Sequence, residues 1–397
     1  MSQKKKNNFY LYTTSNEKIQ EALIRQEKKK RFRQIMGVLI VVVLVAIFFV
    51  YRYRIYREAT VIKNISEISD TTSNTFSYKK GVISLNEDGI SYFDANGKSI
   101  WNKSFSIKNP VFSYCGDYIA VGNKKGNEVC VLDNEGKIKE FSVSYPITDI
   151  EVASQGVVAV TLNNGDENYI EMYDMSQKKL VTIKTTSETN GYPMDIDLSE
   201  DGQNLAVSYL TIDGLKVKSR LAFYDFGEDG KEKEDRLIAG YDYMDTVISK
   251  VKYMNHSTLC AIGDNKILLY NTNQTPTKKK EIEVTKNIAS VSMTDSKFLI
   301  VTDQNQKNAN EKYEMKLYNT SGNEIMDSKF SGEYSHVSLG EHDILFCGNN
   351  NYFLYSLIGK KLYESNTDQR IYVMSQTGKQ GKYLVTYNNK MQFLRMR

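Results

Sequence analysis

Residues 110–143 read PVFSYCGDYIAVGNKKGNEVCVLDNEGKIKEFSV, four short apolar segments separated by turn-forming residues. The segments cover residues 110–114, 118–121, 129–133 and 138–143. The second and third are apolar at consecutive positions, which is typical of strands covered on both faces, whereas the fourth mixes apolar and charged residues. Glycines and acidic residues between the segments favour tight turns. We therefore predict four strands, of which the last meets solvent.

The third segment recurs along the chain as an apolar strand that ends in an aromatic residue or Leu and is followed by Asp, Asn or a substitute. These following residues are Asp94, Asp133, Asp174, Asp225, Asn271, Asn319, Ser356 and Arg395. A glycine comes next at Gly97, Gly136, Gly322 and Gly359, where it supplies the positive φ of a tight hairpin. Four strands per unit, repeated roughly every 37–51 residues, indicate the blades of a β-propeller.

Eight such units can be counted, and the last, residues 370–397, has three strands before the chain stops. Because a propeller must close its ring or leave an unpaired edge, we expect residues 59–65 (ATVIKNI) to supply the missing outer strand. The prediction is an all-β, eight-bladed propeller over residues 76–397. Seven blades remain an alternative, because residues 72–78 make a weak first strand for the first unit.

The repeats resemble those of WD40 and quinoprotein-type (PQQ-like) β-propellers. The turn between first and second strands in such repeats resembles residues 198–207 (LSEDGQNLAV), and the turn and outer strand of a PQQ-like repeat resemble residues 94–101 (DANGKSIW). The whole arrangement also resembles single-pass, membrane-anchored propeller proteins of Gram-positive bacteria. The resemblance implies a propeller over residues 59–397 but no particular activity, because propellers host many.

An apolar run, residues 35–51 (IMGVLIVVVLVAIFFVY), precedes the repeats and carries no charge. As a helix it spans roughly 26 Å, close to the thickness of a bilayer core. Ten Lys and Arg residues come before it and four between it and residue 63, so the positive-inside rule places the N-terminus in the cytoplasm. We predict a basic cytoplasmic tail with a short helix over residues 1–34, lying on anionic lipid headgroups. An uncleaved signal-anchor helix (35–53) in the lipid bilayer, a linker (54–75) and an extracytoplasmic propeller follow.

The sequence contains no HExxH, GxSxG, P-loop or Rossmann glycine motif. Asp195 and Asp197 alternate along one strand and point the same way, toward the channel, which leaves weak cation binding open. Their spacing does not fit an EF-hand. For His336, in a first strand near the channel, a structural role is favoured over a ligand role. The single Trp, Trp101, falls on an outer strand, which argues against the aromatic floor of a quinoprotein. We therefore predict no catalytic residue, metal site or cofactor.

Two long connections between second and third strands, residues 210–220 and 303–312, lie on one rim, and the charged connection 227–245 reaches the same rim. Exposed tyrosines beside charges are typical of protein contact surfaces; tolerated surface insertions are the alternative. The candidate contact residues are Tyr209, Lys216, Lys218, Arg220, Tyr241, Tyr243, Lys307 and Lys312.

These features favour a non-catalytic binding or scaffold module for a protein or a cell-wall ligand. The alternative is an envelope enzyme or sensor that uses the channel or the rim loops. The net charge of +4 is concentrated around the apolar run, so it indicates lipid headgroups and not nucleic acid.

Overall fold

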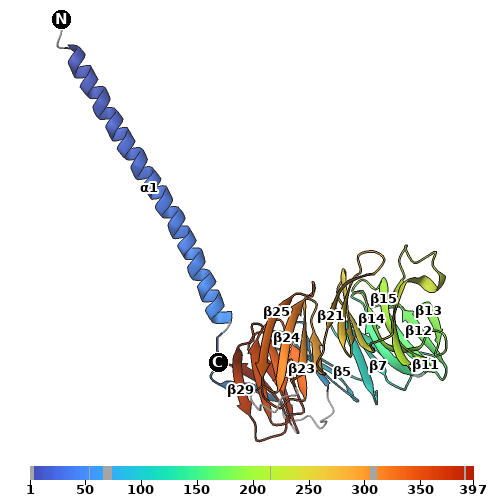
Figure 1. Cartoon of the computed structure of the whole chain (residues 1–397). Coiled ribbons are helices and arrows are strands. Elements are labelled where there is room, and N and C mark those ends of the chain that lie inside the picture. The colour runs from blue at the N-terminus through green and yellow to red at the C-terminus, as the bar shows by residue number, and fades with distance from the viewer. Residues whose placement is uncertain (1–3, 53, 66–73, 215, 305–310, 389) are drawn as a thin grey trace. The chain divides into compact units, whose positions relative to one another are not determined.

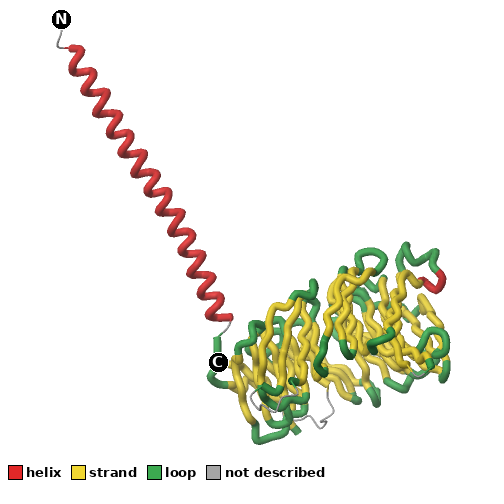
Figure 2. Tube along the Cα trace, viewed as in Figure 1, coloured by secondary structure: helices red, strands yellow, loops and turns green. Residues whose placement is uncertain are grey.

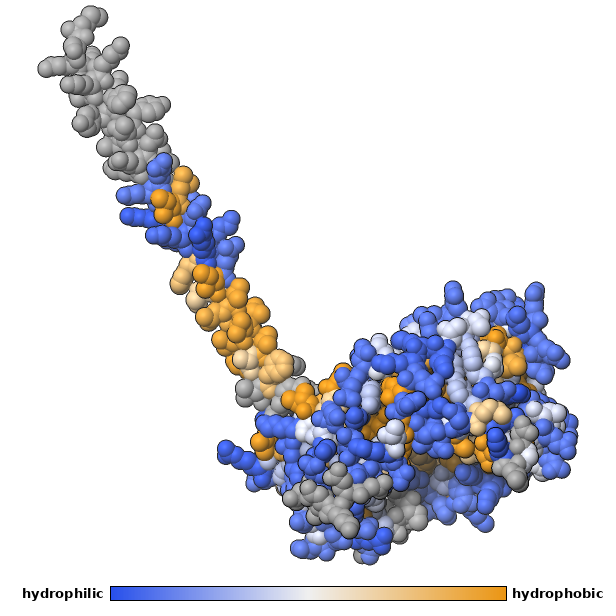
Figure 3. Space-filling model, viewed as in Figure 1, coloured by the Kyte–Doolittle hydropathy of each residue, from blue (hydrophilic) through white to orange (hydrophobic). Residues whose placement is uncertain are grey.

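The computed structural model describes residues 4–52, 54–65, 74–214, 216–304, 311–388 and 390–397, without the side chains of residues 4–19, 22, 48, 50–52 and 213. The chain divides into two units, Met1–Ile55 and Tyr56–Arg397. The first contains α1 (Lys4–Arg52), whose apolar side chains form the exposed orange band in Figure 3, with Val38 65% and Leu44 60% exposed. Among the residues that the structure describes, no helix is both long enough and apolar enough to span a membrane.

In the second unit, the described strands form eight four-stranded antiparallel sheets, which we call blades 1 to 8 in chain order (Figures 1 and 2). The first strands, which line the central channel, are β2 (Asn74–Tyr78), β6 (Pro110–Cys115), β10 (Ile147–Val152), β14 (Tyr192–Leu198), β18 (Ile248–Asn255), β22 (Ile288–Met293), β26 (His336–Leu339) and β30 (Val373–Gln376). The second strands are β3 (Gly81–Asn86), β7 (Tyr118–Asn123), β11 (Val158–Asn164), β15 (Asn204–Asp213), β19 (Thr258–Gly263), β23 (Lys297–Asp303), β27 (Asp343–Cys347) and β31 (Lys382–Tyr387).

The third and outer strands complete each blade. The third strands are β4 (Gly89–Asp94), β8 (Glu128–Leu132), β12 (Glu167–Tyr173), β16 (Lys216–Asp225), β20 (Lys266–Asn271), β24 (Tyr313–Asn319), β28 (Asn351–Ser356) and β32 (Lys390–Met396). The outer strands are β5 (Ser99–Ser104), β9 (Ile138–Ser142), β13 (Lys179–Thr186), β17 (Leu237–Tyr243), β21 (Thr277–Glu283), β25 (Glu324–Phe330), β29 (Lys361–Asn366) and, for blade 8, β1 (Ala59–Ile65). A short 3-10 turn, η1 (Glu234–Arg236), precedes β17.

Blade 8 is closed by the first strand of the unit. Strand β1 pairs antiparallel with β32, from Ala59 opposite Met396 to Ile65 opposite Met391. The Arg397 N–H donates to the Glu58 carbonyl at 2.9 Å and continues this pairing past the strand end. The predicted ring closure by residues 59–65 is therefore present, and the ring has eight blades and not seven. Of the weak first strand expected over residues 72–78, the part from Asn74 is β2, and residues 72 and 73 lie outside the described residues.

The core of the propeller lies between the blades. The described apolar residues form eight buried clusters, one at each interface between neighbouring blades. At the closing interface between blades 8 and 1, Val82 and Phe393 are fully buried, and Ile62 and Ile65 of β1 pack against them. Each fully buried side chain of this size contributes about 1.5–3 kcal/mol. The second strands are apolar at consecutive central positions because each face covers a neighbouring blade.

The recurring Asp and Gly make the turn between the third and outer strands. The Asp94 carboxylate accepts the N–H groups of Asn96 at 2.8 Å and Lys98 at 2.9 Å. Gly97 has φ 81°, and a Cβ there would lie 2.6 Å from the Phe393 ring of the preceding blade. The positive φ predicted for these glycines is confirmed, and close contact with the neighbouring blade is a second reason for glycine.

One predicted loop is instead regular strand. Of residues 210–220, expected as a long connection, 210–213 and 216–220 continue β15 and β16 as a two-stranded ladder in which Ile212 pairs with Val217. The alternating Leu210-Thr-Ile-Asp segment and the β-branched Val217 suit a strand better than a coil. Most of the second predicted loop, residues 305–310, lies outside the described residues.

Candidate functional site

The eight first strands place one ring of polar side chains around the channel. In each blade the ring residue pairs with the central residue of an apolar triplet in the second strand, so the register fixes its position. The polar ring consists of Ser77, Ser113, Glu151, Asp197, Lys252, Ser292, Ser338 and Ser375. All eight line one cavity of about 1210 Å³ in the channel.

Several ring side chains bond the first strand of the next blade. The Val152 N–H donates to Ser113 Oγ at 3.4 Å, and the Leu339 N–H donates to Ser292 Oγ at 2.9 Å. The Tyr253 N–H donates to the Asp197 carboxylate. These bonds satisfy backbone donors that face the channel and have no strand partner, so at three of the eight described positions the ring residue accepts a hydrogen bond from the next blade.

Lys252 is the one basic side chain among the eight residues of the polar ring. An ammonium group carries three donors and no acceptor, so Lys252 cannot accept the N–H of Met293, the equivalent of Val152 and Leu339. Among the described residues its Nζ has no hydrogen bond or ion pair. Asp197 is the main cause that raises the pKa of Lys252 above its ordinary value, with Glu151 adding to it. The ammonium therefore stays charged, deep in the channel, without a direct partner.

Carboxylates gather beside this lysine on blades 3 to 5. Burial raises the pKa of Asp195 to about 7, even though Lys250 lies 3.7 Å away and the Val251 N–H donates to it at 2.7 Å. Burial, with Asp197 and Asp149 nearby, raises the pKa of Glu151 well above its ordinary value. Burial also raises the pKa of Asp149 and that of Asp197. Acids of this cluster therefore keep protons at neutral pH. The net charge of the four acids and two lysines is then less negative than it would be with all four acids ionised.

The adjoining part of the cavity wall, on blades 1 and 2, is aromatic. Phe76 stacks on Phe112 with ring centroids 4.1 Å apart and on Tyr114 at 5.1 Å. The Tyr114 side chain is 45% exposed although it lies in the channel, so its ring faces open space there. We call these three rings the aromatic shelf. The cavity also reaches the turns between first and second strands, such as Gly116 and Glu200, and thus opens at that rim.

The extended blade 4 hairpin, residues 210–214 and 216–219, lies on the opposite rim. Strand β14 pairs with β15 only as far as Tyr192 opposite Leu210, and β17 pairs with β16 only as far as Tyr243 opposite Ser219. Beyond those points the two described strands pair only with each other. Ile212 is 75% and Val217 47% exposed at the tip. The hairpin therefore presents apolar side chains and two open strand edges to solvent.

The three tyrosines proposed as contact residues use their hydroxyl groups inside the protein. Tyr209 is 1% exposed and shares a hydrogen bond with the Tyr224 hydroxyl at 3.0 Å. The Tyr243 hydroxyl bonds that of Tyr270, and the Tyr241 hydroxyl donates to a backbone carbonyl of blade 5. The ring of Tyr209 is thus not at the surface, and those of Tyr241 and Tyr243 are half-buried.

The basic candidates lie at the rim in different settings. Lys216 is exposed at the hairpin tip, and Lys218 is half-buried. Arg220 makes a two-pronged pair with Asp242, at 2.7 and 3.1 Å. Lys312 pairs with Glu333 at 2.7 Å, and Lys307 lies outside the described residues. The structure brings Lys216, Lys218 and Arg220 together on one hairpin and leaves Lys312 on blade 6.

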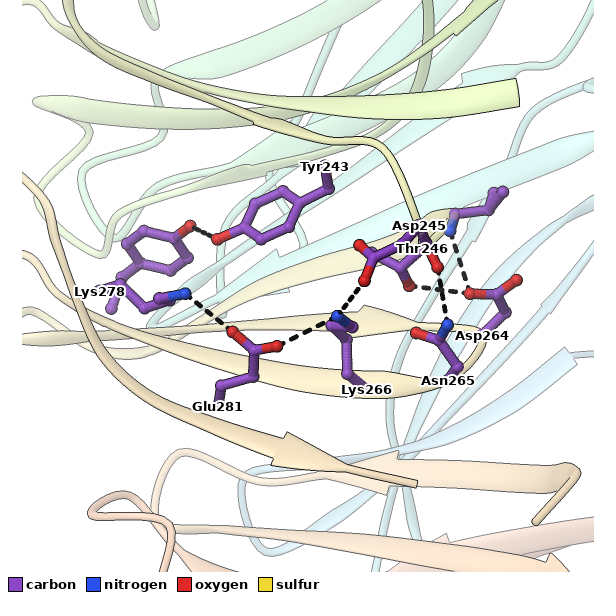
Figure 4. A network of polar contacts seen from close by, with 10 residues as sticks. Tyr243, Asp245, Thr246, Asp264, Asn265, Lys266, Lys278 and Glu281 are labelled. Atoms are coloured by element: carbon purple, nitrogen blue, oxygen red, sulfur yellow. Dashed lines mark hydrogen bonds and ion pairs between the residues drawn. The ribbon is translucent and has the colours of Figure 1, made fainter. Parts of the chain in front are cut away.

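A polar network holds the segment that follows β17 (Figure 4). Lys266 donates to Asp245 at 2.7 Å and lies 3.1 Å from Glu281. Asp264 accepts the Thr246 hydroxyl at 2.8 Å and the Val247 N–H at 3.0 Å. The network fastens the connection between blades 4 and 5 to the β19–β20 turn. We assign it a structural role, because its charges are matched to one another.

The histidines are dispersed. His256 is exposed in the turn between β18 and β19, and His342 is half-buried in the corresponding turn of blade 7. His336 begins β26 and lines the cavity; burial lowers its pKa. Among the described residues, no three His, Cys, Asp or Glu side chains are grouped as a metal site requires.

Sequence reasoning found Asp195 and Asp197 but missed Asp149, Glu151 and Lys252. Aligning the eight first strands on their apolar centre would have placed a serine at five ring positions and shown Glu151, Asp197 and Lys252 as the departures. The aromatic shelf had no such signal, because Phe76 and Phe112 occupy positions that hold apolar residues in the other blades.

The fold and the channel define the chain as an eight-bladed β-propeller, and comparison with solved structures agrees. The crystal structure of the C-terminal WD40 domain of Sif2 is similar with a TM-score of 0.57 and 11% identity, covering 86% of this chain and 99% of that one. The crystal structure of BamB from Moraxella catarrhalis has a TM-score of 0.53 and 11% identity, covering 85% and 100%. At this identity the likeness shows the fold alone.

Residues 52–396 match the model of a family described as a family of unknown function (DUF5711), and the chain belongs to that family. No curated protein matches the sequence. The family therefore identifies the propeller but gives no activity, and the function must be argued from the surfaces above.

Proposed function

We propose that this chain is a non-catalytic binding module that engages a protein partner through the blade 4 hairpin. The observation that carries the proposal is the hairpin tip, with Ile212 75% exposed beside two strand edges that have no partner among the described residues. Exposed apolar side chains favour association because burying them releases water. An open edge offers backbone donors and acceptors to an added strand. Lys216 at the same tip favours an acidic neighbour.

We further propose that the module is tethered to the cell membrane as a single-pass protein, with the N-terminus cytoplasmic and the propeller outside. Support comes from the uncharged run 35–51 and from the basic residues that precede it. The run includes Phe48, Val50 and Tyr51, whose side chains are not described. Its described side chains are exposed in an isolated helix, and a lipid environment would cover them.

Site-specific photo-crosslinking in cells tests the hairpin. A benzophenone side chain at Val217 is compared with one at Ile358, which is 58% exposed in a turn of blade 7. We expect one adduct of defined mass from Val217 and none from Ile358. An Ile212→Lys substitution, which charges the apolar tip, should abolish that adduct. The same set of adducts from both positions would show that the hairpin contacts only random neighbours.

A further inference from the structure

The polar ring contains one side chain whose hydrogen-bonding groups have no partner among the described residues. Serine occurs at five of the eight positions, and on blade 5 the chain has Lys252 instead. Asp197 and Glu151 keep Lys252 charged, and because its three donors make no hydrogen bond among the described residues, they can serve a ligand in the cavity. The neighbouring Glu151 also has a carboxyl oxygen without a hydrogen-bond partner among the described residues. Its Oε2 accepts from Ser113, and its Oε1 has no hydrogen bond among the described residues.

The two walls of the cavity offer different chemistry to the same space. Lys252 on blade 5 provides donors and Glu151 on blade 3 provides an acceptor, and the exposed ring of Tyr114 on the neighbouring blade 2 provides a flat apolar face. A ligand that meets both walls must combine hydroxyl groups, which both donate and accept, with an apolar face. Sugar rings have this combination, because their hydroxyl groups lie at the rim and their C–H groups lie on the faces.

The charge balance disfavours an ion as occupant. The Asp195 pKa of about 7 and the raised pKa of Glu151 mean that acids of the cluster keep protons near neutral pH. Those that ionise are balanced by Lys250 and Lys252. The carboxylates would repel an anion, and the two lysines would repel a cation. A neutral polar molecule is repelled by neither.

The size of the cavity limits the length of the occupant. Its volume of about 1210 Å³ lies above the roughly 300–1,000 Å³ typical of sites for drug-sized molecules. The turns between first and second strands line the cavity, and no described residue of the blade 4 hairpin does. A short chain of sugar units fits this space better than a single one, and it can enter while the hairpin is occupied.

We infer that the central channel is a binding site for a neutral saccharide chain. A sugar ring stacks on the aromatic shelf at Tyr114, and its hydroxyl groups accept from Lys252 and donate to Glu151. This site is separate from the proposed protein contact and does not rest on it. The cluster on blades 3 to 5 thus acts as a hydrogen-bonding wall, with Ser113 and Asp197 holding its members in place.

Isothermal titration calorimetry of the full chain in detergent micelles tests the inference. The probes are cellotetraose, chitotetraose and maltotetraose, with spermidine and inorganic phosphate as charged alternatives. We expect at least one tetrasaccharide to bind with a Kd below about 1 mM and both charged probes to fail. Lys252→Ser, which installs the residue found at most positions of the ring, should weaken saccharide binding roughly tenfold or more, and the circular dichroism spectrum shows whether the variant is folded. Tyr114→Ala should weaken it similarly.

Two variants outside the cavity are the matched controls. Tyr192→Ala removes a tyrosine that is 40% exposed, and Lys98→Ser removes an exposed lysine; both should bind as the unmodified chain does. No binding of any of the three tetrasaccharides at about 10 mM, or binding that neither Lys252→Ser nor Tyr114→Ala weakens, would overturn the inference. Binding of spermidine or phosphate in place of the sugars would also overturn it.

Discussion

Asp195 links the channel to the pH dependence of folding. Its pKa of about 7 lies above that of an unfolded chain because it is buried, so the folded state holds a proton that the unfolded state releases between about pH 4 and 7. The free energy of unfolding therefore falls as the pH rises through this window. We expect the protein to be more stable at pH 5.5 than at pH 8 by up to about 2 kcal/mol, because only the part of the window from about pH 5.5 to 7 lies between the two measurements and each pH unit contributes about 1.4 kcal/mol. Asp195→Asn should reduce the difference, since the amide cannot ionise but its oxygen can still accept the Val251 N–H.

Denaturant unfolding of both chains at the two pH values measures this difference. Asp242→Asn is a suitable control, because the hydrogen bond from Arg220 lowers the pKa of Asp242 and keeps it ionised throughout the window. Its pH dependence should match that of the unmodified chain. If Asp195→Asn shows the full pH dependence of the unmodified protein, the stabilising proton is held elsewhere.

At the scale of single elements, β1 joins the two ends of the propeller. Its Ile62 and Ile65 pack against the blade 8 to blade 1 cluster, whereas Val61 is 48% exposed. Ile62→Asp puts a charge against that cluster, so we expect it to lower the free energy of unfolding by about 2 kcal/mol or more. It should also promote association, because a released β1 leaves β32 as an open edge. Denaturant unfolding and light scattering measure the two effects.

The exposed neighbour Val61 supplies the control for this experiment. Val61→Asp introduces the same charge one residue away, on the solvent side of the same strand, and should change stability by less than about 0.5 kcal/mol. Equal losses in the two variants would mean that β1 contributes through its backbone alone and that the packing of Ile62 is unimportant.

For the whole molecule, the proposed topology predicts which parts are reachable from outside the cell. Ile358→Cys, on an exposed turn of the propeller, should react with a membrane-impermeant maleimide in intact cells. Ser15→Cys, in the basic tail, should react only after lysis. Three of the four native cysteines are buried and the fourth is half-buried, and burial raises the pKa of each thiol, so they should give little background. The reverse labelling pattern would exclude the topology.

The number of blades could be predicted from the sequence because the signal is local. Asp94 accepts hydrogen bonds from residues two and four positions later, and Gly97 completes the same turn. All the residues that form the turn are therefore close together in the sequence, where the motif can be recognised. The closure by β1 also followed, because a ring of sheets has no other way to pair its last edge. Both features depend on backbone geometry that every blade must repeat.

The channel could not be predicted as well, because its contacts join residues far apart in the chain. Ser113 bonds Glu151 and Asp197 bonds the N–H of Tyr253, and the partners share no type or spacing. The blade 4 hairpin was expected as a loop because the segment between the second and third strands is longer there than in most other units. The β-branched pair Ile212 and Val217 indicated a strand and was overlooked. Because the site residues differ from blade to blade, the repeat pattern does not predict them.

The closing strand has a consequence for how the protein is made. Strand β1 leaves the ribosome early, yet its partner β32 lies about 330 residues later, a delay of roughly 16–65 s at about 5–20 residues per second. During that time Ile62 and Ile65 have no cluster to join, and seven blades can assemble while the ring stays open. Every incomplete chain therefore exposes an unpaired strand edge that can pair with other chains. Loss of the last strand alone would leave the ring open, and chaperones and proteases would act on it.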